Sequence, residues 1–136
     1  MQIMIVEDDA VAALSFETIL RFHGHEIVGP FSCPSDVFKA LQGGTPDLVL
    51  MNIDLKGNAS GLDCARVLFK RYGIPVVFIS GDAGKAQLGR DVALGYMPKP
   101  MSENVMLTGI HAIEELIQGR MPKHIPPGLE VFQRPS

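Results

Sequence analysis

Cysteine, positive charge and long apolar runs are all scarce in this chain of 136 residues. The two cysteines, Cys33 and Cys64, form no Cys-x-x-Cys pair, which argues against a disulfide framework or a zinc site and is typical of a reducing compartment. Twelve Lys and Arg against fifteen Asp and Glu give a net charge of −3, so the chain lacks the basic field that nucleic acids require.

The chain also shows no targeting or membrane signal. Its first six residues carry no basic group and acids begin at Glu7, which argues against a signal peptide. No apolar run approaches the roughly 20 residues of a membrane helix. We therefore expect a cytoplasmic protein that contacts neither membranes nor nucleic acid directly.

The length fits one domain, and the 46% hydrophobic content is typical of a packed globule. Four prolines interrupt the last sixteen residues: Pro122, Pro126, Pro127 and Pro135. We expect one domain over residues 1–120 and a Pro-rich tail over residues 121–136 without secondary structure of its own.

Apolar runs alternate with amphipathic stretches along the chain. The expected strands are Ile3–Val6, Ile27–Val28, Asp47–Ile53, Ile74–Ile79 and Tyr96–Met97. The expected helices are Ala10–Phe22, Pro34–Leu41, Gly61–Arg71 and a last one capped by Ser102, whereas residues 83–95 are too weakly patterned to assign. This alternation predicts an α/β fold, with a doubly wound five-stranded parallel sheet of order 2-1-3-4-5 and helices on both faces.

Polar side chains follow the strands where each one ends. In an open parallel sheet the ligand site lies at the carboxyl ends of the strands. The residues placed there are Glu7, Asp8, Asn52, Asp54, Ser80 and Lys99. Carboxylate and carbonyl oxygens suit Mg²⁺, while a hydroxyl and a lysine suit the oxygens of a phosphoryl group.

Four motifs occur in order: IMIVEDD, PDLVLMNIDLKG, VVFIS and GYMPKP. With this set, residues 1 to about 119 resemble the receiver domain of two-component response regulators. The resemblance implies Mg²⁺ as cofactor, with Asp8 as a direct ligand and Glu7 acting through water. It also implies that Asn52 occupies the phosphoacceptor position and that the Asp54 backbone carbonyl is a further metal ligand.

The remaining roles also follow from the resemblance. Ser80 and Lys99 match the catalytic hydroxyl and lysine that hold the phosphoryl group. Tyr96 matches the aromatic that rotates with Ser80 in the switch, although a half-buried strand aromatic is an equal alternative. The Lys99–Pro100 bond matches a cis peptide of the family. These residues come from GYMPKP and VVFIS.

The first departure from the family is Asn52, since receivers carry Asp there and transfer phosphate to its carboxylate. A carboxamide is a poor nucleophile, and the lost charge predicts weaker Mg²⁺ binding. Asp54 is a poor substitute because it lies about 6–7 Å further along an extended chain. The sequence leaves open whether Asn52 is native or an introduced replacement.

The second departure is the short spacing of 19 positions from Ser80 to Lys99, about one helical turn less than in most receivers. The motif VFISG resembles a receiver subfamily with VFxTG after the fourth strand. We therefore expect a short or irregular fourth helix.

Together these features predict a stand-alone receiver in a phosphorelay, a signalling module without enzymatic turnover. Its expected partners are a histidine kinase or histidine phosphotransferase and a downstream protein target, and it is expected to be a monomer or homodimer. One alternative is a phosphate-independent adaptor of the same fold. Another is a Mg²⁺-dependent phosphohydrolase, which Glu7-Asp8-Asp9 fits poorly because that class needs a nucleophilic Asp in a DxD arrangement.

Overall fold

The computed structural model describes residues 1–55 and 60–132. The strands are β1 (Gln2–Val6), β2 (Glu26–Phe31), β3 (Leu48–Asn52), β4 (Val76–Ser80), β5 (Gly95–Pro98) and β6 (Glu130–Val131). The helices are α1 (Ala10–Phe22), α2 (Pro34–Ala40), α3 (Gly61–Tyr72), α4 (Ala83–Gln87) and α5 (Glu103–Ile117), with a 3-10 turn η1 at Leu41–Gly43.

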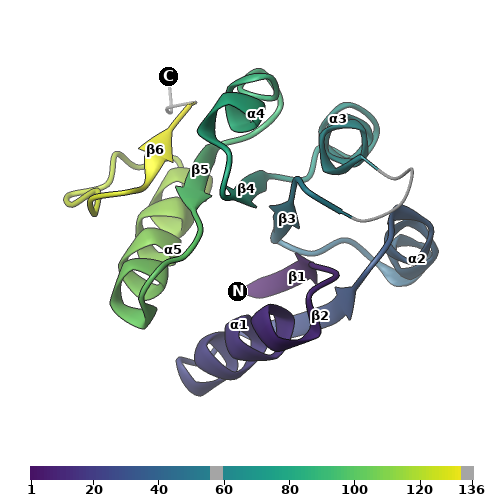
Figure 1. Ribbon diagram of the computed structural model, residues 1–136, viewed down its shortest axis with the longest axis horizontal. Helices are drawn as coiled ribbons and strands as arrows, with labels where there is room; N and C mark the ends of the chain where they lie inside the picture. Colours follow the sequence, from purple (N-terminus) through teal and green to yellow (C-terminus); the bar gives the residue numbers. More distant parts are fainter. Residues whose placement is uncertain (56–59, 133–136) are drawn as a thin grey trace.

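The sheet order is β2-β1-β3-β4-β5-β6, and β1 to β5 pair in parallel. Figure 1 shows α1 and α5 along one face of the sheet and α2, α3 and α4 along the other. This confirms the predicted α/β fold and the order 2-1-3-4-5.

The central strands are buried on both faces, as their unbroken apolar runs predict. In β3, Val49 and Met51 pack into the core under α2, α3 and α4, while Leu48 and Leu50 pack into the core under α1 and α5. All four are fully buried. The strands are therefore fixed from both sides, and their carboxyl ends are held at one edge of the sheet.

Caps and one glycine set where helices begin beside that edge. The Asp9 carboxylate accepts hydrogen bonds from the first turn of α1, and Ser102 accepts one from Val105 in α5. At the start of α3, a Cβ on Gly61 would collide with the backbone carbonyl oxygen of Asn52. A glycine there lets α3 begin directly against the end of β3.

The short fourth helix is confirmed, since α4 has only five residues. The expectation that residues 121–136 contain no secondary structure is wrong in one part, because Glu130–Val131 form β6 antiparallel to β5. An edge strand leaves backbone groups unpaired, and the returning chain pairs with them. Two residues are too few to give a strand pattern in the sequence. The boundary at residue 120 stays a prediction, and residues 133–136 lie outside the described part.

Candidate functional site

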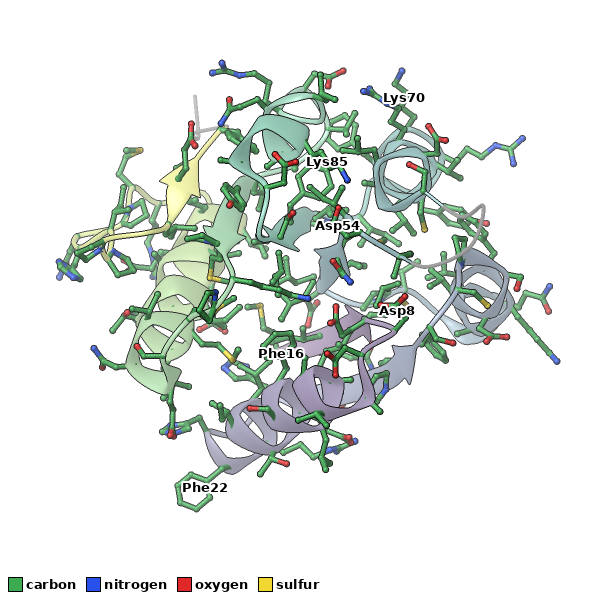
Figure 2. The ribbon with its side chains drawn as sticks, viewed as in Figure 1. Asp8, Phe16, Phe22, Asp54, Lys70 and Lys85 are labelled. Atoms are coloured by element: carbon green, nitrogen blue, oxygen red, sulfur yellow. The ribbon has the colours of Figure 1, made fainter. Side chains whose placement is uncertain are left out.

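The predicted site residues meet at the carboxyl edge of the sheet. Hydrogen bonds join the end of β3 to the loop after β1, the end of β4 to the loop after β3, and the loop after β5 to Glu7. Figure 2 shows Asp8 and Asp54 at this edge, with Lys85 reaching toward Asp54 from α4. The strand order thus brings together groups far apart in the sequence.

Asn52 is buried, and both ends of its carboxamide are engaged. Its Nδ2 donates to Asp8 Oδ1 at 3.4 Å, and its Oδ1 accepts from the Asp54 backbone N–H at 3.0 Å. A carboxylate at this position could accept the second bond but could not donate the first. The amide therefore joins position 52 to Asp8, where two carboxylates would repel each other.

Lys99 pairs with Glu7 rather than with position 52. Its Nζ lies 2.7 Å from Glu7 Oε1, and the Glu7 side chain is 1% exposed. Burial raises the pKa of Glu7 above its ordinary value, while the hydrogen bond and charge of Lys99 oppose that rise. Glu7 Oε2 is buried without a hydrogen-bond partner among the described residues.

Ser80 and Asp54 form a second cluster with a residue that sequence reasoning missed. Ser80 Oγ donates to Asp54 Oδ2 and accepts from the Asp82 backbone N–H, both at 2.9 Å. Lys85 Nζ donates to the other carboxylate oxygen, Asp54 Oδ1, also at 2.9 Å. Asp54 was expected to contribute only its backbone carbonyl, and Lys85 falls in the stretch too weakly patterned to assign, so no sequence signal pointed to this pair.

Tyr96 lies inside the molecule, 5% exposed. Its hydroxyl donates to the backbone carbonyl of Ser80 at 3.0 Å, and burial raises its pKa above the ordinary value. Tyr96, which the resemblance places in the switch together with Ser80, therefore contacts the backbone of Ser80 directly. The Lys99–Pro100 bond is cis, as expected from the resemblance.

Replacing Lys85 tests the Asp54 cluster. The hydrogen bond from Lys85 is the largest cause of the pKa of Asp54 lying below its ordinary value. Burial opposes this by raising the pKa, and the hydrogen bond from Ser80 lowers the pKa further. We expect Lys85→Met to raise the Asp54 pKa toward that ordinary value in an NMR titration of its carboxyl carbon. Because the folded pKa is lowered, the pair stabilises the fold above the ordinary Asp pKa, and this contribution is lost as pH falls through the folded pKa. The contribution is small because both side chains are substantially exposed.

The control for this titration is Lys70→Met, which removes an exposed lysine of α3 (Figure 2). It makes the same change of charge away from Asp54. An Asp54 pKa that moves equally in both variants would show that net charge, not the ion pair, sets its value.

The donor set at this edge suits a divalent cation only in part. Among residues 1–55 and 60–132, no three His, Cys, Asp or Glu side chains gather closely enough to hold a metal ion. Two carboxylates, Glu7 and Asp8, and the oxygen of Asn52 are what remains, together with backbone carbonyls. The buried Glu7 Oε2, which has no hydrogen-bond partner among the described residues, fits the role of a cation ligand.

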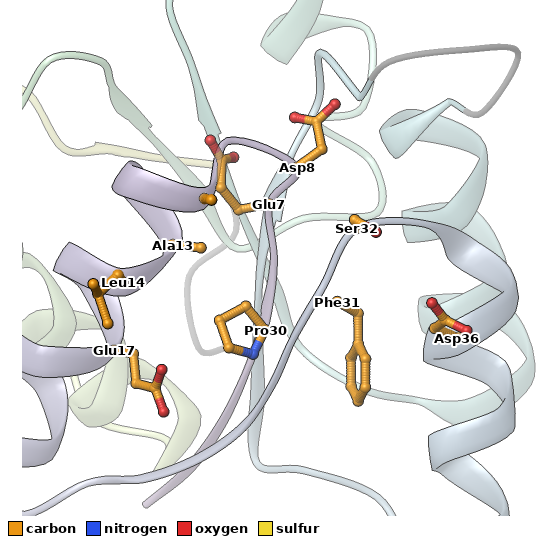
Figure 3. Close-up of a pocket in the computed structure, with 10 residues that line it drawn as sticks. Glu7, Asp8, Ala13, Leu14, Glu17, Pro30, Phe31, Ser32 and Asp36 are labelled. Atoms are coloured by element: carbon orange, nitrogen blue, oxygen red, sulfur yellow. The ribbon is translucent and has the colours of Figure 1, made fainter.

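Surface pockets flank the site, one of them lined by Asp54 and Lys85 and two others bordered by α1. Of the latter two, one lies between α1 and the chain after β2, and Figure 3 shows Glu7, Asp8, Glu17 and Asp36 around it. The other lies between α1 and the loop after β5 and is lined by Val11, Phe16, Lys99, Pro100 and Met101, among others.

In the described part of the chain, no helix is long and apolar enough to cross a bilayer.

Comparison with known proteins identifies the family to which the chain is similar. Residues 3–111 match the family model of the response regulator receiver domain. The chain is 32% identical over 80 residues to the phyllosphere-induced regulator PhyR of Methylorubrum extorquens, a match that covers 58% of this chain and 30% of PhyR. It is 30% identical over 118 residues to the protein PilH of Pseudomonas aeruginosa, covering 82% of this chain and 96% of PilH.

Solved structures agree with the fold. The receiver domain of NtrX from Brucella abortus superposes with a TM-score of 0.74 at 27% identity, covering 82% of this chain and 98% of that one.

The transcriptional regulatory protein PdtaR of Mycobacterium tuberculosis is matched over 54% of its length. The chain thus spans about a third to a half of PhyR and PdtaR. From its family match across most of its length, the chain belongs to the response regulator receiver domains of two-component signalling.

Proposed function

We propose that this chain is a stand-alone receiver of a phosphorelay in which phosphate uptake at position 52 is blocked. It acts by binding another signalling protein, without catalytic turnover. One observation carries the proposal: position 52 holds a buried carboxamide whose two ends are engaged within the protein. Its Nδ2 donates to Asp8 and its Oδ1 accepts from the Asp54 backbone N–H.

The chemistry of position 52 supports the block. Acceptance of phosphate needs an anionic oxygen that attacks phosphorus while the bond to the donor breaks. The Asn52 carboxamide is neutral, and its oxygen already accepts a hydrogen bond from Asp54 N–H. Asp54 is anionic, but its two oxygens accept from Ser80 and Lys85, so it serves as an ion-pair partner and not as a substitute acceptor.

We further propose a weakened Mg²⁺ site at the same edge. Glu7 and Asp8 would provide carboxylates, Asn52 its amide oxygen and Asp54 its backbone carbonyl. Bound Mg²⁺ would supply positive charge to phosphate oxygens. Lys99 competes for this place, because it already neutralises Glu7 at 2.7 Å. The neutral amide at position 52 lowers the affinity further, since a cation gains less from two carboxylates than from three.

The partner surface we propose is the side of α1 that faces the loop after β5. Val11 is 80% exposed there and lines the pocket with Phe16 and Pro100. Contiguous exposed apolar side chains mark interaction surfaces, and Leu14, three positions after Val11 on the same helix, is exposed as well. The partner is a histidine kinase or histidine phosphotransferase, and a downstream protein target is a second candidate partner. The protein would act in the cytoplasm as a monomer or homodimer, without direct contact to nucleic acid or membrane.

Binding to a histidine phosphotransferase domain tests the surface. We expect Val11→Asp to weaken binding about tenfold or more, because it would bury an unpaired carboxylate in the interface and a tenfold loss corresponds to only ~1.4 kcal/mol. The matched control is Phe22→Asp, since Phe22 is also exposed on α1 but lies at its other end (Figure 2). Equal affinities for the two variants, measured by titration calorimetry, would place the partner elsewhere.

Loading the phosphotransferase with phosphate tests the block itself. In the presence of Mg²⁺, we expect the phosphate to remain on its histidine when this chain is added, and the affinity to be the same with and without phosphate. Asn52→Asp is the positive control for a competent pair. Transfer of phosphate to the unaltered chain would contradict the proposal.

A further inference from the structure

The C-terminal strap, defined as residues 125–132, crosses the edge of the sheet at β5 (Figure 1). Ile125, Leu129 and Val131 pack into the core under α1 and α5, whereas Phe132 packs into the core on the opposite face. The Phe132 backbone N–H donates to the Leu94 carbonyl at 2.8 Å. The strap therefore closes the outer edge of β5 and touches both layers of the fold.

The strap lies very close to β5. Val131 pairs with Gly95, and a Cβ on residue 95 would lie 2.6 Å from the Glu130 carbonyl oxygen. Only glycine allows this approach without a shift of the backbone. The strand pairing nevertheless involves only two residues of β6, so backbone bonds alone hold it weakly.

Side chains of α4 and the turn after it add the rest of the attachment. Gln87 Nε2 donates to Glu130 Oε2 at 2.9 Å. The guanidinium of Arg90 lies 6.0 Å from the centre of the Phe132 ring, within the range of a cation–π contact. The carboxyl end of α4 and the turn after it thus contact the strap through two side chains.

The amino-terminal part of the same helix contacts the site. Lys85 pairs with Asp54, and the Asp82 backbone N–H, which precedes α4, donates to Ser80 Oγ. A helix of five residues is not stable by itself. Its position is therefore set by tertiary contacts: Ala86 is buried in the core, Arg66 of α3 donates to the Leu88 carbonyl, and polar side chains join the helix to the site and to the strap.

We propose that α4 couples the Asp54–Ser80 cluster to the docking of the strap on β5. When Lys85 loses Asp54, α4 loses its side-chain ion pair to the loop after β3, its position becomes less constrained and the strap opens more often. An open strap exposes the unpaired edge of β5, which can pair with an extended segment of a partner protein. This coupling runs through Asp54 and does not depend on phosphate at position 52, so it is independent of the proposed function.

Hydrogen exchange of the Phe132 amide measures strap opening in the full chain. We expect Lys85→Met to speed this exchange roughly two- to fivefold, the effect of losing one exposed ion pair. Lys70→Met, the matched control on α3, should leave it unchanged. Exchange of the Leu50 and Met51 amides in β3 reports on the integrity of the fold and should be the same in all variants.

A second variant tests the path through the helix. Gln87→Ala should also speed Phe132 exchange, and adding Lys85→Met to it should have a smaller effect than Lys85→Met has alone. Identical Phe132 exchange in Lys85→Met and Lys70→Met would overturn the coupling. Fully additive effects of Lys85→Met and Gln87→Ala would overturn the path through α4.

Discussion

Asn52→Asp is expected to take up one phosphoryl group when incubated with Mg²⁺ and a small phosphodonor, whereas the unaltered chain takes up none. The new carboxylate forms a bond to phosphorus while the bond to the donor's leaving group breaks. Ser80 and Lys99 stand at the neighbouring strand ends, and each needs only to exchange Asp54 or Glu7 for a phosphoryl oxygen. Intact mass measures the result directly.

Asn52→Ala is the control, since it removes the amide without providing a nucleophile. Should Asn52→Asp stay unphosphorylated, the arrangement of Ser80 and Lys99 or the short segment between them fails to support transfer, and the adaptor alternative gains. A phosphoryl group on the unaltered chain would instead direct attention to Asp54, the other acid at this edge.

The second large effect expected is on Mg²⁺ affinity, which Asn52→Asp should raise about 10- to 100-fold. Two unit charges about 4 Å apart attract by roughly 4 kcal/mol at an effective dielectric of 20, and displacement of Lys99 from Glu7 takes back part of that gain. Without metal, the same variant should be less stable, because the donated bond from Asn52 to Asp8 is replaced by repulsion.

Titration calorimetry of Mg²⁺ checks this expectation. Asn104→Asp is the matched control, because it makes the same chemical change at an exposed position of α5. If both variants bind Mg²⁺ alike, the added charge acts only through the net charge of the chain, and the metal site is not at position 52.

The central part of the fold could be predicted because its signals are local. Runs such as Ile3–Val6 are apolar at every position, as strands buried on both faces require, and all four residues are buried. The caps Asp9 and Ser102 likewise act within their own helices. In contrast, β6 depends on pairing with β5, from which α5 separates it in the chain, and two residues are too few to form a strand pattern in the sequence.

The site was predictable as a set of positions but not as a set of contacts. Parallel strands place Glu7, Asn52, Ser80 and Lys99 at one edge whatever their partners are. The pairing of Lys99 with Glu7 follows from the burial of the Glu7 carboxylate. The pairing of Lys85 with Asp54 follows from the position of the five-residue helix α4. Both are tertiary properties, which local sequence does not carry.

The most direct test of the account is the amide NMR spectrum of the unaltered chain in Mg²⁺, recorded before and after a small phosphodonor is added. We predict that the signals of Asp54, Ser80, Tyr96 and Lys99 stay where they are, since position 52 offers a carboxamide and no carboxylate to take up the phosphoryl group. A second set of signals for these residues after addition of the donor would show that the site still responds to phosphate, and would contradict the account.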